Sequence, residues 1–296
     1  MEALLQWGVD LILAIQQIHG PALDSIFRAI TSMGEEEFYL LLLPLLFWCI
    51  DSRLGACLAI LLLFSSYLNA DLKDLFQQPR PFDFNPDVQL AYAEGFGLPS
   101  GHAQSSMIAW ASIATWTRKT WFWVVAIVLI VLIGFSRVYL GVHFPTDVLV
   151  GWSIGAALLG LYLALQPKIG SRLARLNLCL QILLALAIPI VLFLIHPVAD
   201  TAAIMGALAG VGVGLTLTHQ YISLNISGPW WHCALRFLIG IAAVFALYLG
   251  LKWLFPSDGL VFYHAFRFLG YGIIGLWVTL GAPWLFGILR LAPKTE

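Results

Sequence analysis

Long apolar segments recur along almost the whole chain, and short polar stretches separate them. A helix needs about 20 apolar residues to cross a bilayer, and somewhat fewer when interfacial side chains flank it. By that measure the sequence predicts nine membrane spans, near residues 36–50, 54–70, 102–117, 121–137, 147–166, 177–195, 201–222, 233–254 and 260–289. The pattern therefore predicts an all-α fold, a polytopic bundle of membrane helices.

The first 30 residues follow a different pattern, in which apolar residues alternate with Gln, Asp and His. Six apolar side chains of this segment can share one helix face: Leu4, Leu5, Trp7, Leu11, Ile12 and Ile15. This arrangement favours an amphipathic helix that lies in the membrane interface, and a tenth span is the alternative. We divide the chain accordingly into an N-terminal segment (1–35), a helix bundle (36–166) and additional C-terminal spans (167–296).

Composition supports the membrane assignment and excludes other classes of protein. Hydrophobic residues make up 60% of the chain and charged residues 10%, whereas an average soluble domain carries about 25% charged residues. The net charge of −1 leaves no polybasic patch, so we expect no nucleic acid partner. The four cysteines lie in or beside apolar stretches without the spacing of metal ligands, and we expect no metal site.

Positive charges gather in the loops that follow the first, third, fifth and ninth spans. These residues are Arg53, Arg118, Lys119, Lys168, Arg172, Arg175, Arg290 and Lys294. The positive-inside rule assigns those loops to the cytoplasm, so the N-terminus and the loops 71–101 and 138–146 face outward. Residues 1–20 lack the basic start of a secretory signal. We expect an integral protein of a bacterial inner membrane, with a cytoplasmic C-terminus.

The outward loops nevertheless contain cations, in three pieces of sequence that antiparallel packing of the spans would bring to one outer mouth. The pieces are "KDLFQQPRP" (73–81), "PSGH" (99–102) and "SRVYLGVHFPTD" (136–147). They supply Lys73, Arg80 and Arg137 on the side of the membrane that cations avoid. An arginine offers a planar fork of donors that matches phosphate oxygens, and a lysine adds a compact charge. The three cations therefore point to a phosphate ligand.

The second piece precedes an apolar helix and suits an anion for a separate reason. Gly101 lets the backbone approach a ligand closely, and the amides of Ser100, Gly101 and His102 would point at the anion from the positive end of the helix dipole. The pattern GxxxxGK[ST] does not occur in the sequence, so nucleotide hydrolysis has no support.

The third piece contains a histidine and a carboxylate at a spacing that suits nucleophilic catalysis. His143 and Asp147 are four residues apart, and Pro145 marks a helix start between them. The carboxylate of Asp147 could accept a hydrogen bond from one ring nitrogen and leave the other free to attack. His102 then remains as the acid that protonates the leaving oxygen.

Each of these residues also has a simpler interpretation. His143 could be an interfacial ring, Asp147 or Ser100 a helix cap, and Arg80 with Pro81 a turn that carries an exposed charge. Asp83, Asp87 and Glu94 lie in the same outer loop, where they could gate access or bind a headgroup, although solvated loop charges are the favoured interpretation. Ionisable residues embedded in a membrane are costly and tend to be functional, so we favour one site built from all three pieces.

The three pieces together resemble the signature of the type 2 phosphatidic acid phosphatase superfamily, K-x6-R-P, P-S-G-H and S-R-x5-H-x3-D, over about residues 54–166. Every position is matched, by Lys73, Arg80, Pro81, Pro99, Ser100, Gly101, His102, Ser136, Arg137, His143 and Asp147. The number of spans resembles the longer members, the sphingosine-1-phosphate phosphatases and glucose-6-phosphatase. The resemblance implies hydrolysis without metal or cofactor, through a phosphohistidine on His143, with phosphoryl oxygens held by the cations and the Ser100–Gly101 amides.

The site lies at the outer edge of the bilayer, so the substrate should be a lipid whose tail stays in the membrane. Phosphatidic acid, phosphatidylglycerophosphate, sphingoid phosphates and undecaprenyl pyrophosphate all fit, and a soluble sugar phosphate fits less well. The sequence is also compatible with two other functions. One is a phosphotransferase that passes the phosphoryl group to a lipid hydroxyl, and the other is a transporter of anions or lipids. The sequence leaves the oligomeric state open.

Overall fold

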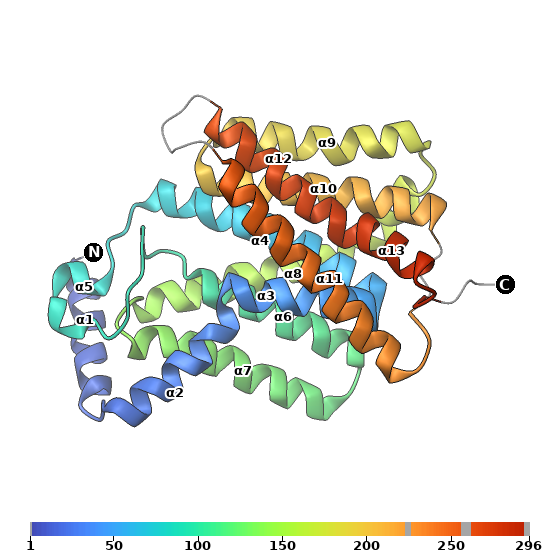
Figure 1. Ribbon diagram of the computed structural model, residues 1–296. Helices are drawn as coiled ribbons and strands as arrows, with labels where there is room; N and C mark the ends of the chain where they lie inside the picture. The colour runs from blue at the N-terminus through green and yellow to red at the C-terminus, as the bar shows by residue number, and fades with distance from the viewer. Residues whose placement is uncertain (1, 223–225, 256–261, 293–296) are drawn as a thin grey trace. The chain divides into compact units, whose positions relative to one another are not determined.

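The computed structural model describes residues 2–222, 226–255 and 262–292, and these residues form helices and no strand. Lys294, one of the charges used to orient the chain, lies outside them. The α-helices shown in Figure 1 are α1 (Glu2–Gln16), α2 (Pro21–Thr31), α3 (Glu36–Leu45), α4 (Ser52–Phe76), α5 (Pro81–Phe84), α6 (Gly101–Thr117), α7 (Thr120–Tyr139), α8 (Pro145–Leu173), α9 (Leu178–Ile195), α10 (Ala199–Tyr221), α11 (Trp230–Leu254), α12 (Tyr263–Leu276) and α13 (Ala282–Ile288).

Four shorter helical turns connect some of these helices. They are the 3-10 turns η1 (Ser32–Gly34) and η3 (Pro86–Val88) and the π-helical turns η2 (Leu46–Ile50) and η4 (Trp277–Gly281). The all-α membrane fold predicted from the sequence is confirmed.

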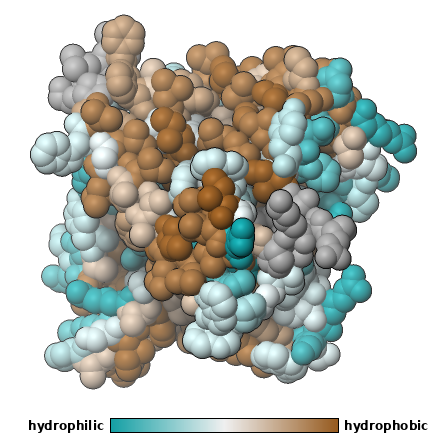
Figure 2. Space-filling model, turned by 45° about the vertical axis from the view of Figure 1, so that its right-hand side comes forward, coloured by the Kyte–Doolittle hydropathy of each residue, from teal (hydrophilic) through white to brown (hydrophobic). Residues whose placement is uncertain are grey.

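A helix occupies each of the nine predicted spans, but they differ in length. Within the described residues, seven helical stretches are long and apolar enough to cross a membrane. The two others are shorter: α6 has 17 residues, and α3 has 10 residues before it changes into the π-helical turn η2. Pro44 lies inside α3 and has no backbone N–H to donate to the preceding turn. The large apolar areas in Figure 2 are those expected of a surface in contact with lipid.

The chain divides into two compact units. The first consists of residues 1–39 and 68–164, and the second of residues 40–67 and 165–296. The boundaries fall inside α3, α4 and α8. All three sequence pieces with candidate chemistry belong to the first unit, and so does the N-terminal segment.

The N-terminal segment differs in two respects from the single amphipathic helix that its sequence suggested. It forms two helices, because the chain turns at Gly20 and Pro21 starts α2. In addition, one side of α1 packs against protein: Leu5, Val9 and Ile12 are buried in a cluster with Val88, Ala103, Val138, Phe144 and Val148. Leu4 and Trp7, which we expected on the same face as Leu5, are about half exposed, at 52% and 50%.

A buried glutamine at the end of α1 links the segment to the rest of the first unit. The side-chain Nε2 of Gln16 donates to the carbonyl of Val88 at 2.8 Å and to the carbonyl of Tyr139 at 2.7 Å. The Tyr139 hydroxyl in turn donates to Asp24 of α2 at 2.5 Å. The ring of Tyr139 also lies 4.2 Å from that of Phe27, centroid to centroid. These contacts place α1 and α2 beside α5 and α7, as Figure 1 shows.

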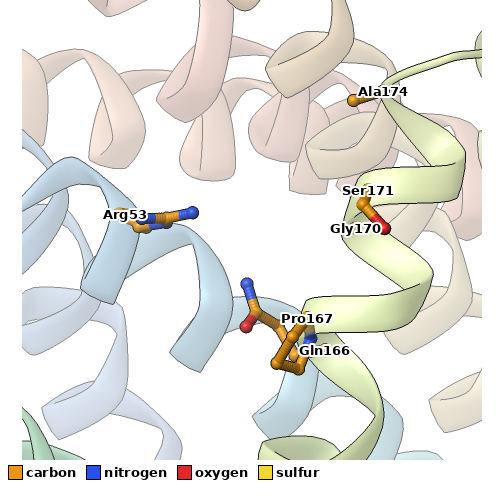
Figure 3. A pocket seen from close by; sticks show the side chains of 6 residues that line it. All are labelled: Arg53, Gln166, Pro167, Gly170, Ser171 and Ala174. Atoms are coloured by element: carbon orange, nitrogen blue, oxygen red, sulfur yellow. The ribbon is translucent and has the colours of Figure 1, made fainter.

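The second unit is held together by close packing of small residues. Helices α10 and α12 approach so closely that a Cβ atom at Gly206 would lie 2.1 Å from the carbonyl oxygen of Phe268. A cavity of about 370 Å³ also belongs to this unit, and Figure 3 shows its lining residues, Arg53, Gln166, Pro167, Gly170, Ser171 and Ala174. No residue with candidate chemistry lines it.

The two hydrogen bonds of Gln16 generate a prediction about stability. The substitution Gln16→Leu leaves two buried carbonyls without that donor, and we expect it to lower the free energy of unfolding by ~2 kcal/mol. Gln17→Leu is the matched control, since Gln17 is exposed. Thermal unfolding of the purified variants in detergent measures the difference. Equal melting temperatures for the two variants would show that Gln16 does not link the segment to the unit.

Candidate active site

The candidate residues lie at or beside the ends of five helices, all within the residues of the first unit. Lys73 is in the last turn of α4, and Arg137 is in the last turn of α7. Ser100 directly precedes α6, whose first turn contains Gly101 and His102. Arg80 precedes α5, and Asp147 is in the first turn of α8. His143 lies in the short loop between α7 and α8, within reach of the charges of Lys73, Arg80, Arg137 and His102.

The structure brings His143 and Asp147 together as their spacing predicted. The ring nitrogen Nδ1 of His143 lies 3.4 Å from Oδ2 of Asp147, and both side chains are buried. The same carboxylate oxygen accepts the backbone amide of Phe144 at 2.9 Å. Asp147 therefore contacts the histidine ring and also caps the start of α8, so the two interpretations of this residue do not exclude each other.

Gln78 is a functional candidate that the sequence did not reveal. Its side-chain Nε2 donates to Oδ1 of Asp147 at 2.7 Å, which leaves Oδ2 to face Phe144 and His143. The position of Gln78 inside the first sequence piece was a signal for a role in the site. Nothing in the sequence, however, indicates which of the two neighbouring glutamines, Gln77 or Gln78, turns toward the carboxylate.

The interpretation of Arg80 as an exposed charge in a turn is wrong, because the side chain is only 3% exposed. Its guanidinium donates to the carbonyls of Gly95 at 2.8 Å, Val142 at 2.8 Å and Glu94 at 2.5 Å. The atom Nη1 also lies 3.4 Å from Nε2 of His143. Arg80 therefore fixes the loop that contains Glu94 and Gly95 against the loop that contains His143, and it places positive charge beside the ring.

The acidic residues of the same loop lie at the protein surface. Asp83, Asp87 and Glu94 are exposed, in line with the favoured interpretation of solvated charges. Asp83 accepts the backbone amide of Arg80 at 2.7 Å, which stabilises the start of α5. Within the described part of the chain, no group of three or more His, Cys, Asp or Glu side chains is arranged to hold a metal ion.

The start of α6 differs in one detail from the expectation. The amide of Ser100 is not free for an anion, because it donates to the carbonyl of Asp147 at 3.0 Å. The amides of Gly101 and His102 lie in the first helical turn and have no intrahelical acceptor. The Ser100 side chain makes no cap hydrogen bond, although the residue occupies the cap position, so its hydroxyl does not serve as a helix cap.

Three buried polar atoms of the site have no hydrogen-bond partner among the described residues: Oγ of Ser100, Nε2 of His102 and Nε of Arg137. Buried polar atoms in native proteins are nearly always paired, so each of these calls for an explanation. A hydroxyl, an imidazole and a guanidinium can all donate. A ligand rich in acceptor oxygens would satisfy all three.

The protonation of His143 follows from its surroundings. Burial lowers the pKa of His143 well below its usual value of 6.5, and the charges of Arg137, Arg80, Lys73 and His102 lower it further. The ring is therefore neutral at pH 7. With Nδ1 directed at the Asp147 carboxylate, a proton on Nδ1 leaves the lone pair of Nε2 available as a nucleophile.

Comparisons with known proteins show which family the chain resembles. Residues 54–171 match the PAP2 superfamily, and residues 202–294 match the transmembrane extension of PAP2 superfamily phosphatases. Lipid phosphate phosphatase delta of Arabidopsis thaliana is 32% identical over 55% of this chain and 43% of its own length. Sphingosine-1-phosphate phosphatase 2 of Mus musculus is 31% identical over 66% of this chain and 59% of its own. The chain thus spans about half the length of these two relatives.

A solved structure matches a similar part of the chain. The crystal structure of a transmembrane PAP2-type phosphatidylglycerolphosphate phosphatase from Bacillus subtilis is 30% identical. It superimposes with a TM-score of 0.51, and the match covers 57% of this chain and 89% of that protein.

The unpaired hydroxyl of Ser100 generates a prediction about anion binding. We expect Ser100→Ala to weaken the binding of orthovanadate ~10-fold, because a hydrogen bond to a charged group contributes about 1.5–3 kcal/mol. Ser106→Ala is the matched control, since Ser106 is buried on the same helix but donates to the carbonyl of Ala103. Titration calorimetry in detergent compares the two variants. Unchanged affinity in Ser100→Ala would show that this hydroxyl does not face the anion.

Proposed function

The chain belongs to the PAP2 superfamily, and on that basis we propose that it is an integral membrane lipid phosphate phosphatase. It hydrolyses a phosphomonoester or pyrophosphate of a lipid through a phosphohistidine intermediate on His143. The observation that carries this proposal is the set of three unpaired buried donors, on Ser100, His102 and Arg137, in the same unit as a neutral histidine held by a carboxylate.

In the first chemical step, Nε2 of His143 attacks the phosphorus atom, and the bond from phosphorus to the lipid oxygen breaks. His102, in its protonated form, donates a proton to the departing oxygen, so the lipid leaves as an alcohol. The proton on Nδ1 of His143 stays directed at Asp147, which stabilises the positive charge that develops on the ring. Lys73, Arg80 and Arg137 stabilise the charge on the three equatorial oxygens.

In the second step, water attacks the phosphohistidine. His102 is now neutral and accepts a proton from the water molecule as the bond from nitrogen to phosphorus breaks. Inorganic phosphate leaves, and both histidines return to their starting protonation states. The proposed sequence needs no metal ion, because the cations and the amides of Gly101 and His102 supply the electrostatic stabilisation.

The substrate class follows from the membrane setting and from the relatives. Two of the similar proteins are named for lipid phosphates and for sphingosine-1-phosphate, and the solved structure is that of a phosphatidylglycerolphosphate phosphatase. We propose a lipid phosphate presented at the outer face of the membrane, since the charged loops that follow the first, third and fifth spans favour the cytoplasm for the opposite end.

Release of inorganic phosphate tests the proposal. The purified protein is incubated in detergent with phosphatidic acid, phosphatidylglycerophosphate, sphingosine-1-phosphate and undecaprenyl pyrophosphate in turn. We expect release from at least one of them, undiminished in excess EDTA, and a loss of at least ~10³-fold in His143→Ala. His19→Ala is the matched control, because His19 is largely solvent-exposed.

Each rival function predicts a different result in the same assay. A phosphotransferase would move labelled phosphate to a lipid acceptor and release none to water. A transporter or simple anion-binding protein would release none, or would release it equally well in His143→Ala. Loss of activity in EDTA would contradict the absence of a metal from the reaction.

The role of His102 as general acid generates a prediction about the leaving group. A lipid alkoxide must be protonated as it departs, whereas p-nitrophenolate is stable without a proton. We expect His102→Ala to lower kcat/KM by about 10²–10⁴-fold for the lipid substrate and by no more than ~10-fold for p-nitrophenyl phosphate. Steady-state kinetics with both substrates makes the comparison. Equal losses for the two would contradict the assignment.

A further inference from the structure

An arginine of the proposed site is bonded to the N-terminal segment, far away in the sequence. Nη1 of Arg137 donates to the hydroxyl oxygen Oγ1 of Thr31 at 2.8 Å, across a separation of 106 residues, and both residues are buried. Thr31 is the last residue of α2, directly before the turn η1. The hydroxyl therefore reaches the guanidinium from outside the three pieces of sequence that carry the chemistry.

The backbone alone does not fix the guanidinium of Arg137. The carbonyl of Arg137 accepts the amides of Val142 and His143, at 3.2 and 3.3 Å, so its main chain is held close to the nucleophile. Its side chain is long, however, and rotates about several bonds. With Nη1 bonded to Thr31, the planar guanidinium has a defined orientation. The N–H of the buried atom Nε is then available to an acceptor oxygen of a ligand.

The type of residue at position 31 suits this task. Arg137 lies within the electrostatic reach of Arg80, so two positive charges repel each other next to His143, and the carboxylate of Glu35 offsets part of this repulsion from a distance. A carboxylate bonded directly to Arg137 would hold it firmly but would neutralise the charge that the phosphoryl oxygens need. A hydroxyl accepts one hydrogen bond and carries no charge, so it can orient the guanidinium without competing with the substrate.

A second contact of the same segment reaches the proposed general acid. Gly34, in η1, lies so close to His102 that a Cβ atom at this position would be 2.6 Å from Cδ2 of the imidazole ring. Residues 31–34 therefore adjoin the site at two points. The segment is part of the wall of the site and not only a membrane-surface helix.

We propose that Thr31 is a positioning residue, which orients the Arg137 guanidinium to bind the phosphoryl oxygens of the substrate. This inference rests on the proposed function, and it adds the N-terminal segment to the machinery of the reaction. It also explains why an N-terminal helix pair packs against α7, the helix that carries Arg137.

The test combines three substitutions at one position with a double-mutant cycle. Thr31→Val keeps the shape of the side chain and removes the hydroxyl, and Thr31→Ser keeps the hydroxyl. The control at the neighbouring position is Ser32→Ala, since Ser32 is exposed and donates to the carbonyl of Ala29. Thr31→Ala is a second variant without the hydroxyl, in case the valine does not fold. Orthovanadate affinity and kcat/KM for phosphate release are measured on each folded variant, and Thr31→Val is repeated in an Arg137→Ala background.

We expect Thr31→Val to lower both quantities ~10-fold, Thr31→Ser to restore them to within ~3-fold, and Ser32→Ala to leave them unchanged. In the Arg137→Ala background, Thr31→Val should change neither by more than ~2-fold, because its effect is exerted through Arg137. The inference is wrong if Thr31→Val has the affinity and kcat/KM of the wild type. It is also wrong if Thr31→Val lowers these quantities by the same factor in the Arg137→Ala background as in the wild type. If the wild type binds orthovanadate but releases no phosphate from any lipid, the proposed function fails, and the affinity cycle still decides the role of Thr31.

Discussion

The accumulation of positive charge around one neutral histidine is the constraint on which the rest of the first unit depends. Like charges removed from water destabilise a fold unless other groups compensate. The structure compensates through the backbone: Arg80 donates to three carbonyls, of Glu94, Val142 and Gly95, and so ties two loops together. Arg137 donates to the hydroxyl oxygen of Thr31, and the carboxylate of Glu35 lies within its electrostatic reach. We propose that an anionic ligand supplies the remaining compensation, as expected of a site that binds an anion and must also release it.

Hydrogen bonds also join the three separate pieces of sequence to one another. Arg80 reaches the carbonyl of Val142, Gln78 reaches Asp147, and the amide of Ser100 donates to the carbonyl of Asp147. Each bond connects one of the three pieces to another, so a displacement of one piece moves the others. His143, Asp147 and the start of α6 therefore keep a fixed geometry. A fixed geometry would allow the proposed nucleophile and its carboxylate to act without reorganisation during the reaction.

Features that depend on residues close together in the sequence were predictable, whereas contacts between residues far apart in the sequence were not. Apolar runs located the helices, and the four-residue spacing of His143 and Asp147 across the helix start at Pro145 located their contact, because both depend on residues close together in the sequence. The contact of Thr31 with Arg137 was not predictable, since a threonine gives no sign of a partner 106 residues away. The occupied amide of Ser100 was missed for the same reason. The face of α1 was only partly predicted, because an apolar side chain suits protein and lipid equally well.

Direct location of the phosphoryl group on the enzyme tests the central claim. The protein is mixed with a labelled lipid phosphate that it hydrolyses, quenched in alkali within the first turnover, digested, and the phosphopeptides are sequenced by mass spectrometry. The structure predicts an acid-labile phosphoryl group on His143, attached at Nε2, because Nδ1 faces Asp147. A phosphoryl group at Nδ1, a label on another residue, or turnover without any phosphorylated enzyme would contradict the account.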